Sequence, residues 1–501
     1  MDQKKLLELQ SYRGTKAIGT DTTVRSLDAV ISECRKSIEQ NASKYRDLKP
    51  QEKKEEIKNI IVDYLMDAKP LVEGFITDSG PDLMKLIDRV VADITDYGIL
   101  TQAMMDESIY EIRCNGKEIK VEKDSRIQDL TDKDGNIISF ESTEQQDIIL
   151  RKMLGDVRLT PKDAVVNART IEGYRIAAVH YTALGRDPQD FTGQQYSAFV
   201  LRKFKESKME LPQIVKFGTM SDNMARLFTV CTEGGLTFVT CGPTASGKTT
   251  TNNAALQSVP DNLRVVLLQN PSEIDLRKRD SSGRVYNDVL HLESKEIENP
   301  TPTDPTTINL MNHILRLSPV LVCFGEYRTN KEFALGMIIL QAGHPVNATY
   351  HAEDSEGAMQ RFLTAYMAES GETIYTALNS LASKINIIVI QKILRDGRRK
   401  VIQMTEVLGV DPENPNKALL NDLYRFIPNG DPVYDANGRV IEIPGEHKRV
   451  GKLSKKTMDK LAMEGIPKKR FDFLLKEVDE NEVETYTGDN ITTYGKVIGG
   501  K

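Results

Sequence analysis

The sequence of 501 residues lacks the features that would point to a membrane span, a secreted protein or a disulfide-rich scaffold. No stretch comes near the roughly 18 uninterrupted apolar residues that a membrane helix needs. The first residues, Met-Asp-Gln-Lys-Lys, lead into polar sequence and not into the apolar segment of a secretion signal. The cysteines lie far apart, and none forms a Cys-x-x-Cys pair: Cys34, Cys114, Cys231, Cys241 and Cys323. We therefore expect reduced, mostly buried cysteines and a cytoplasmic protein without a zinc site.

The chain also lacks an excess of basic charge, internal repeats and low-complexity segments. Its net charge is −6 and its isoelectric point is near 5.8, which gives no overall attraction to a nucleic-acid backbone. We expect no nucleic-acid partner. The hydrophobic fraction of 39% and the charged fraction of 28% are typical of a globular protein, and the length suggests roughly two to four domains.

Changes in the spacing of apolar residues predict four segments: a helical domain at 1–92, an α+β domain at 93–206, an α/β domain at 207–410 and a C-terminal extension at 411–501. Ile57, Ile60, Ile61 and Leu65 have helical spacing. The predicted strands of the second segment are Ile109–Arg113, Glu118–Glu122, Ala164–Arg169, Tyr174–Tyr181 and Ala198–Lys203. Those of the third are Leu236–Cys241, Arg264–Leu268, Val320–Phe324, Val346–Tyr350 and Ile385–Ile390. Because strands and helices alternate there, we expect a parallel sheet covered by helices.

The most specific motif follows the first strand of the third segment. Gly242-Pro243-Thr244-Ala245-Ser246-Gly247-Lys248-Thr249 fits the phosphate-loop pattern G-x-x-x-x-G-K-[ST], and Thr250 continues into a helix-compatible run. The glycines allow backbone N–H groups to surround phosphate oxygens at a helix N-terminus. Lys248 would neutralise the outer phosphates, and the Thr249 hydroxyl would bind Mg²⁺. A glycine-rich turn without a nucleotide is the alternative, and the strand before the motif argues against it.

Acidic residues and histidines follow the neighbouring strands. Glu326 ends the apolar run 319–326 and is a candidate to polarise the attacking water or to hold Mg²⁺. Glu273 follows the strand Arg264–Leu268, and we expect it at the same sheet edge. His344 and His351 flank a further strand, and imidazoles are suited to contact a γ-phosphate. Solvated strand ends and ordinary core or surface histidines are the alternative readings.

Three arginines of the α+β domain are further candidates. Arg169, Arg175 and Arg202 each lie in or beside a predicted strand. Surface charge is their default explanation. An arginine supplied from outside the phosphate-loop domain can nevertheless stabilise transition-state charge and couple domain position to hydrolysis.

With these residues in place, the chain resembles the type II/IV secretion ATPase superfamily, and most of all its CpaF or TadA type, which powers Flp (tad) pilus assembly. The similarity runs from about residue 93 to 475. Tyr97-Gly-Ile-Leu and Glu111-Ile-Arg-Cys-Asn-Gly are similar to the family's opening segment, 165–175 to its VDAR…DGSRV segment, and Phe199-Val-Leu-Arg-Lys-Phe to its IRKF segment. Tyr424-Arg-Phe and the segment 435–440 resemble the tail of this subfamily.

The resemblance implies a RecA-like phosphate-loop domain in a homo-hexameric ATPase, with ATP and Mg²⁺ bound between the α+β and phosphate-loop domains. It also implies a motor that acts on an integral-membrane platform protein at the cytoplasmic face of the membrane, which is a peripheral location. The chain departs from the family in its acidic box, which here reads Gln269-Asn270-Pro271 before Glu273, and at Val320, where an aspartate is usual. The loss of two carboxylates predicts slow hydrolysis.

Three other functions remain open from the sequence. Within secretion motors, a conjugative or type IV secretion ATPase is the second choice. A DNA-handling enzyme or small-molecule kinase with a phosphate loop would need a basic groove or an arginine-rich lid. A nucleotide-dependent regulator that rarely hydrolyses ATP is compatible with the altered acidic box. No Asn-Lys-x-Asp motif for guanine is present, which favours ATP over GTP.

Overall fold

The computed structural model describes residues 24–41, 44, 50–68, 70–72, 80–123, 126–185, 195–203, 209–270, 274–295, 297, 300–479, 481–489 and 491. The chain divides into two compact units, Met1–Ser207 and Lys208–Lys501, and each is described by itself. The division falls within the polar sequence 205–212.

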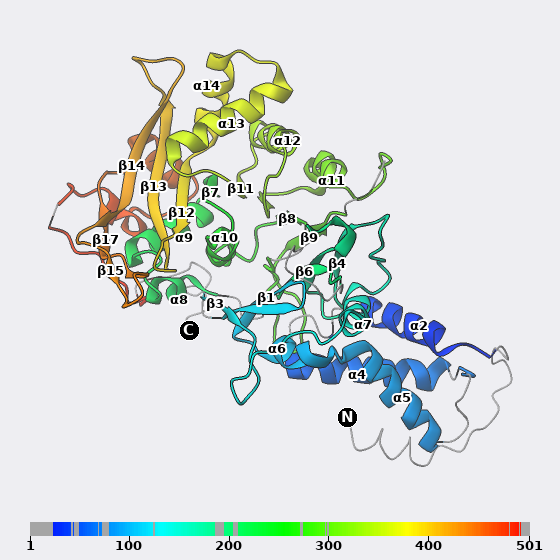
Figure 1. Cartoon of the computed structure of the whole chain (residues 1–501). Coiled ribbons are helices and arrows are strands. Elements are labelled where there is room, and N and C mark those ends of the chain that lie inside the picture. Colours follow the sequence, from blue (N-terminus) through cyan, green and yellow to red (C-terminus); the bar gives the residue numbers. More distant parts are fainter. Residues whose placement is uncertain are drawn as a thin grey trace. The chain divides into compact units, whose positions relative to one another are not determined.

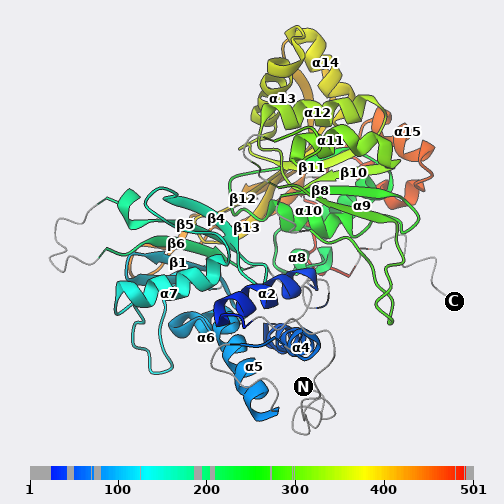
Figure 2. The ribbon, with the colours of Figure 1, turned by 90° about the vertical axis from the view of Figure 1, so that its right-hand side faces the viewer.

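The first unit begins with three helices that share one core, α2 (Leu27–Gln40), α4 (Pro50–Ala68) and α5 (Gly80–Thr95). Figure 2 shows them beside one another. The Ser26 hydroxyl accepts a hydrogen bond from the Ala29 N–H and so caps the start of α2. Core positions recur every three or four residues, as in Ile57, Ile61 and Leu65 of α4, which confirms the predicted helical spacing.

The rest of the first unit is an antiparallel six-stranded sheet in the order β3-β2-β1-β6-β5-β4. Its strands are β1 (Ile109–Asn115), β2 (Glu118–Lys123), β3 (Arg126–Asp129), β4 (Val165–Arg169), β5 (Arg175–Val179) and β6 (Ala198–Arg202). The helical elements are η1 (Gly98–Leu100), α6 (Thr101–Met105), α7 (Thr143–Leu154) and η2 (Tyr181–Ala183). Apolar residues of one sheet face, such as Ile112 and Leu201, pack against Leu150 and Met153 of α7. All five predicted strands are confirmed, whereas β3 was not predicted.

The second unit is built on a nine-stranded sheet in the order β17-β14-β13-β12-β7-β11-β10-β8-β9. Its parallel part comprises β7 (Phe238–Cys241), β8 (Val265–Gln269), β9 (Val289–Glu293), β10 (Leu321–Phe324), β11 (Val346–Tyr350) and β12 (Ile387–Ile393). β7 lies in the middle of the sheet, between β12 and β11, and every residue of β7, β8, β10 and β11 is buried. The predicted α/β fold with a parallel sheet is confirmed.

Helices cover both faces of this sheet (Figure 1). One layer contains α8 (Leu211–Lys216), α9 (Asp222–Glu233) and α10 (Lys248–Leu256). The other contains α11 (Thr307–Ile314), η3 (Leu315–Leu317), α12 (Asn330–Gln341), α13 (Ser355–Ser370) and α14 (Ile374–Lys384). Alternate strand residues serve the two layers: Leu267 packs with the first and Leu268 with the second. The apolar strands are therefore buried on both faces, as expected for a parallel sheet.

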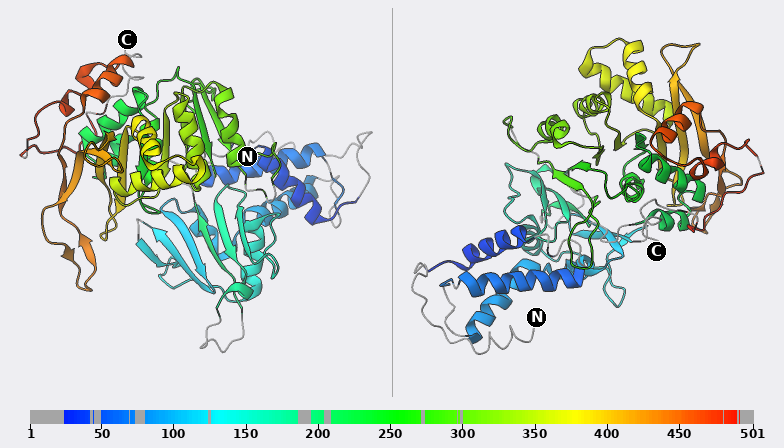
Figure 3. Two further views of the ribbon diagram at one scale, coloured as in Figure 1. Left: turned by 90° about the horizontal axis from the view of Figure 1, so that it is seen from above. Right: turned by 180° about the vertical axis from the view of Figure 1, so that it is seen from behind.

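The sheet does not end at residue 410, where we placed the start of a C-terminal extension. β13 (Arg399–Val410), β14 (Ala418–Pro428) and β17 (Gly445–Arg449) continue it with antiparallel pairing, and β13 and β14 can be followed in Figure 3. A small pair, β15 (Val433–Tyr434) and β16 (Val440–Glu442), lies outside the main sheet. The last helical elements are α15 (Lys455–Met463), η4 (Lys468–Arg470) and η5 (Asp472–Leu474). Leu461 and Leu474 share the core of α8–α10, so these segments are part of the same folded body.

Two polar contacts attach the late segments of the chain to α9. The carboxylate of Asp222, the first residue of α9, accepts hydrogen bonds from the Thr485 hydroxyl at 2.5 Å and from the Gly488 N–H at 2.7 Å. At the other end of α9, Glu233 pairs with Arg470 at 2.6 Å. Both carboxylates are buried, so each contact replaces hydration that the folded state has lost.

All five cysteines are free and buried, which confirms that prediction. Burial raises the pKa of the Cys34 and Cys114 thiols to about 12, so both stay protonated at neutral pH. Within the described residues, no helix has both the length and the apolar character to span a bilayer.

His447 makes the stability of the second unit sensitive to acid. Its Nδ1 lies 2.9 Å from the Tyr486 hydroxyl and its Nε2 lies 3.0 Å from the Val401 carbonyl, which fixes the neutral Nε2–H tautomer. Burial, with a smaller contribution from the Lys400 charge, lowers the pKa of His447 from 6.5 to about 3. Below pH 6.5, His447 is therefore protonated in the unfolded chain but stays neutral in the folded chain. The free energy of unfolding consequently falls as the pH drops from 6.5 towards 3. At pH 5 the loss is about 2 kcal/mol relative to neutral pH.

We expect His447→Gln, which keeps a donor and an acceptor but does not titrate, to flatten this acid slope. Urea midpoints between pH 7.5 and 5 measure the effect. His313→Gln changes an exposed histidine and is the matched control. Equal acid slopes for His447→Gln and the parent protein would contradict the assignment.

Candidate nucleotide site

The predicted phosphate loop lies at the carboxyl end of β7 and leads directly into α10. Its backbone takes positive φ values at Gly242 (153°), Ala245 (64°) and Gly247 (91°), a shape that glycine adopts at little cost. A Cβ atom at Gly242 would lie 2.0 Å from the Gln391 carbonyl oxygen of β12, so only glycine fits there. The motif therefore forms a tight turn at the N-terminus of a nine-residue helix, where N–H groups and the helix dipole favour an anion.

Lys248 is folded back onto this loop. Its Nζ donates hydrogen bonds to the carbonyls of Gly242 at 2.8 Å and Pro243 at 2.9 Å, and the residue is only 6% exposed. Burial lowers the pKa of Lys248, while the nearby charge of Glu326 acts in the opposite direction. The Ser246 hydroxyl is buried in the same loop without a hydrogen-bond partner. A phosphate oxygen would give both side chains a stronger partner than they have now.

The structure brings Glu326 and His351 to the phosphate loop. Glu326 follows β10 and His351 follows β11, the strands that lie nearest to β7 on one side. His351 Nε2 lies 3.1 Å from Glu326 Oε1, and His351 Nδ1 lies 3.2 Å from the Gly242 carbonyl oxygen. Both ring nitrogens thus face acceptors.

Two arginines that we did not predict support this pair. Arg328 Nη2 donates to the Asn270 carbonyl at 2.6 Å, and its Nε lies 3.9 Å from Glu326 Oε2. Arg361 Nη1 of α13 donates to the His351 carbonyl at 2.9 Å. Arg328 stands only two residues after Glu326, so its neighbourhood could have been read from the sequence. Arg361 is placed by the path of α13, and no pattern in the sequence indicates that it lies near His351.

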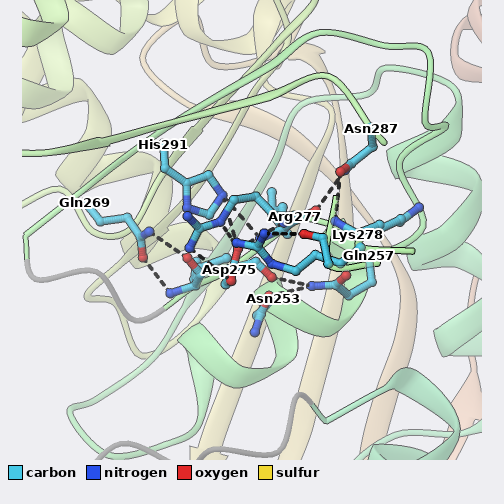
Figure 4. Close-up of polar contacts among 12 residues, drawn as sticks. Asn253, Gln257, Gln269, Asp275, Arg277, Lys278, Asn287 and His291 are labelled. Carbon is cyan, nitrogen blue, oxygen red and sulfur yellow. Dashed lines mark hydrogen bonds and ion pairs between the residues drawn. The ribbon is translucent and has the colours of Figure 1, made fainter. Parts of the chain in front are cut away.

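The altered acidic box has a structural role at Gln269 (Figure 4). Its amide accepts a hydrogen bond from the Ile274 N–H at 2.6 Å and donates to the Ile274 carbonyl at 2.8 Å. Gln269 therefore holds the backbone of Ile274 through both of its polar groups. Glu273 lies outside the described residues, so its predicted role stays a prediction. Beyond it, Asp275 pairs with Arg277 at 2.8 Å and lies 3.6 Å from His291, which makes a satisfied polar cluster.

His344 does not join the site. It precedes β11, whereas His351 follows that strand, and the phosphate loop lies at the end of His351 because Tyr350 pairs with Cys241. A separation of seven residues in extended backbone is about 20 Å. His344 and His351, both of which we named as candidates to contact the γ-phosphate, thus stand beyond opposite ends of β11.

The three predicted arginines of the first unit form one row across its sheet. Arg169 pairs with Arg175 in the β4–β5 register, and Arg175 pairs with Arg202 in the β5–β6 register. Directly opposed residues share a sheet face, here the face away from the apolar core. Directly opposed like charges are destabilising in general, and the proposed role of this row stays a prediction.

For a cation, the described residues around the loop provide hard oxygen donors. Thr249, in the first turn of α10, is partly exposed, as is Glu326, and oxygen ligands of this kind suit Mg²⁺ that arrives with phosphates. Among the described residues, no group of three or more His, Cys, Asp or Glu side chains could hold a metal by itself. Pro243, Thr244, Ala245 and Thr250 are exposed around the loop.

Comparisons with known proteins agree with this geometry. Residues 119–421 match the family described as type II/IV secretion system protein. The uncharacterized protein MJ0900 of Methanocaldococcus jannaschii is 27% identical over 248 residues, which make up 49% of this chain and 40% of that protein. VirB11 of Agrobacterium fabrum is 26% identical over 164 residues, 32% of this chain and 44% of VirB11. These alignments cover less than half of each relative.

Among solved structures, the ATPase DotB of Legionella pneumophila is similar with 20% identity and a TM-score of 0.44, covering 62% of this chain and 81% of that one. The family match is the decisive comparison. It takes in more than half of the chain and includes the phosphate loop, Glu326 and His351. The chain therefore belongs to the type II/IV secretion system protein family.

Proposed function

We propose that this protein is an ATPase that hydrolyses ATP to drive a secretion or pilus machine. One observation carries the proposal: the phosphate loop with Lys248, the acidic Glu326 and His351 meet at one edge of a parallel sheet. This is the edge where α/β proteins bind their ligands. Membership of the family supports the same conclusion.

In the proposed reaction, the loop N–H groups and Lys248 bind the phosphates, and Glu326 orients the attacking water. Before Lys248 can meet a phosphate, its Nζ must leave the carbonyls of Gly242 and Pro243. Glu326 must likewise exchange its contact with His351 for one with water. The Thr249 hydroxyl, with Glu326 nearby, would hold Mg²⁺ that arrives with ATP, and this ion would neutralise phosphate charge.

The arginine row of the first unit is the proposed source of charge from outside the phosphate-loop unit. At least one of Arg169, Arg175 and Arg202 would reach the γ-phosphate of ATP during hydrolysis. A homo-hexameric ring is also part of this proposal, because the nucleotide sites of neighbouring subunits in a ring would act one after another. An integral-membrane platform protein at the cytoplasmic face is the proposed partner, and the protein would be cytoplasmic and peripheral to the membrane.

Within the family, we propose the pilus-assembly role of the CpaF or TadA type. The similarity of Tyr97-Gly-Ile-Leu and Tyr424-Arg-Phe to that subfamily supports it. Conjugative or type IV secretion is the alternative, since VirB11 is among the relatives. A slow nucleotide-dependent regulator is the second candidate function. It is favoured by Gln269, which occupies a carboxylate position of the family and is engaged with Ile274.

Purified protein with ATP and Mg²⁺ tests the proposal. We expect rings in electron micrographs, together with phosphate release that depends on protein concentration as the rings assemble. Alanine variants of Arg169, Arg175 and Arg202, assayed one at a time, should include at least one with strongly reduced turnover. A protein that stays monomeric under all conditions would rule out the motor. Rings with bound ATP but negligible turnover would favour the regulator.

A further inference from the structure

The β12–β13 pair delivers two polar side chains to the phosphate loop, although neither belongs to the loop motif. β12 runs parallel to β7, with Ile390 beside Cys241, so Gln391 stands next to Gly242. β13 returns antiparallel, with Ile393 paired to Arg399. A Cβ atom at Gly247 would lie 2.9 Å from Gln391 Nε2 and 3.1 Å from Arg399 Cδ. Both side chains therefore pack against the Cα of Gly247.

The register of this pair is irregular at the point of contact. Ile390 pairs with Gln403 but Gln391 pairs with Val401, so Ile402 is an extra residue on β13. Such bulges change the direction of the following side chains and recur beside active sites. Here the bulge at Ile402 lies opposite Ile390 and Gln391, beside the start of the phosphate loop. It separates the rest of β13 from Arg399, which reaches the loop.

Arg399 contacts the loop at its most strained residue. Its Nε donates a hydrogen bond to the Ala245 carbonyl at 3.2 Å. Ala245 has φ of 64°, and a residue with a Cβ atom pays about 1–2 kcal/mol to adopt this conformation. Among the described residues with positive φ, only Ala245 and Ser318 are not glycine. A conformation of this cost persists only where the surroundings hold it.

From these contacts we infer that Arg399 is a positioning residue for the phosphate loop, supplied by the same chain and acting through the Ala245 carbonyl. In a trans peptide, the carbonyl and the next N–H point in opposite directions. When Arg399 holds the Ala245 carbonyl, the Ser246 N–H is turned away from β13 and towards the inside of the loop, where its present partner is the Pro243 carbonyl at a long 3.4 Å. A phosphate oxygen in the loop would offer that N–H a better acceptor.

This inference rests on the proposed function, and it assigns Arg399 a task distinct from that of Lys248. Lys248 would bind phosphate, whereas Arg399 keeps the loop in the shape that accepts phosphate. Losing Arg399 should therefore weaken the binding of every nucleotide whose phosphates occupy the loop. Turnover at saturating ATP should change little, because Arg399 does not contact the reacting atoms.

Arg399→Met is the informative variant, because it retains an unbranched apolar stem beside Gly247 and removes the donor. We expect the affinity for ATP and for ADP to fall by about tenfold each, with kcat within about threefold of the parent. Arg399→Lys, which keeps a cationic donor, should recover part of the loss. Fluorescent ATP and ADP analogues measure the affinities, steady-state phosphate release gives KM and kcat, and thermal unfolding confirms that the variants fold.

Arg398→Met is the matched control. Arg398 is the adjacent arginine, and it pairs with Glu442 at 3.0 Å and lies 3.8 Å from Asp396 instead of contacting the loop. It should bind ATP like the parent. Unchanged affinity in Arg399→Met would overturn the inference, and so would a loss confined to ATP, since that would place Arg399 at the γ-phosphate. If the parent protein itself binds no ATP, the proposed function fails, which is a different result.

Discussion

Replacing Lys248 with alanine is expected to lower the affinity for ATP at least about 100-fold. Lys248 is the only side-chain cation within the loop motif, and its Nζ already lies among loop carbonyls where phosphate would bind. Burial lowers the pKa of this ammonium group because the folded protein removes most of its hydration. A phosphate of ATP would replace this hydration, so phosphate binding would also stabilise the charge of Lys248. Titration with a fluorescent ATP analogue measures the loss.

Lys331→Ala is the control, since Lys331 is an exposed lysine in the first turn of α12. It should bind ATP normally. The Lys248 variant should still fold, although two carbonyls lose their hydrogen bonds from Nζ. The Gly242 carbonyl still contacts His351, and Pro243 is an exposed residue whose carbonyl water can reach. Undiminished ATP affinity in a folded Lys248→Ala protein would mean that the loop does not bind nucleotide through this lysine.

Glu326→Gln is expected to spare ATP binding and to slow hydrolysis by about 100-fold or more, roughly 3 kcal/mol of transition-state stabilisation. The amide keeps the size of the side chain and can still accept a hydrogen bond from His351, but it has lost the charge that would orient and polarise water. Rings should persist. Phosphate release and nucleotide binding, measured on the same preparation, separate the two effects.

Glu273→Gln is the necessary comparison, because Glu273 is the other predicted carboxylate. If Glu273 carries the chemistry, its variant should fail while Glu326→Gln hydrolyses ATP within a few-fold of the parent. Glu332→Gln is not a suitable control, because the Glu332 carboxylate accepts hydrogen bonds from the backbone N–H groups of Arg328 and Thr329 in the capping box of α12. Near-normal turnover in Glu326→Gln would refute its assignment.

The sequence predicted the parallel strands other than β9 because their residues are apolar on both faces, whereas β9 is only partly buried. Runs such as Ile387–Ile390 leave no polar position, and a buried strand is their simplest explanation. The antiparallel strands β13 and β14 escaped prediction since polar residues such as Gln403 and Asp422 occur within them. The structure explains this pair: the Gln403 side chain donates a hydrogen bond to Asp422 at 2.8 Å across the two strands. Pairing that satisfies polar side chains is invisible until the partner strand is known.

The site was predicted in part for a similar reason. Lys248 and Glu326 belong to motifs whose chemistry can be read locally, and the structure places both at one sheet edge with His351. Gln391 and Arg399 come from strands far along the chain, and only the sheet order brings them to the loop, whereas Arg361 reaches the His351 carbonyl from α13. His344 was a candidate for the same contact as His351, but it lies before β11 whereas His351 follows that strand.

The attachment of α9 to residues 485–488 has a consequence for the order of events during synthesis. Asp222 and its partner Gly488 are 266 positions apart, and Glu233 and Arg470 are 237 apart. A ribosome therefore releases the helix beside the phosphate loop long before the segments that complete its surroundings. Until those segments emerge, buried carboxylates such as Asp222 stay hydrated and the apolar face of α9 lacks Phe473 and Leu474. Contacts of such long range form slowly, so the second unit completes its packing around α9 only after residues 470–488 have been synthesised.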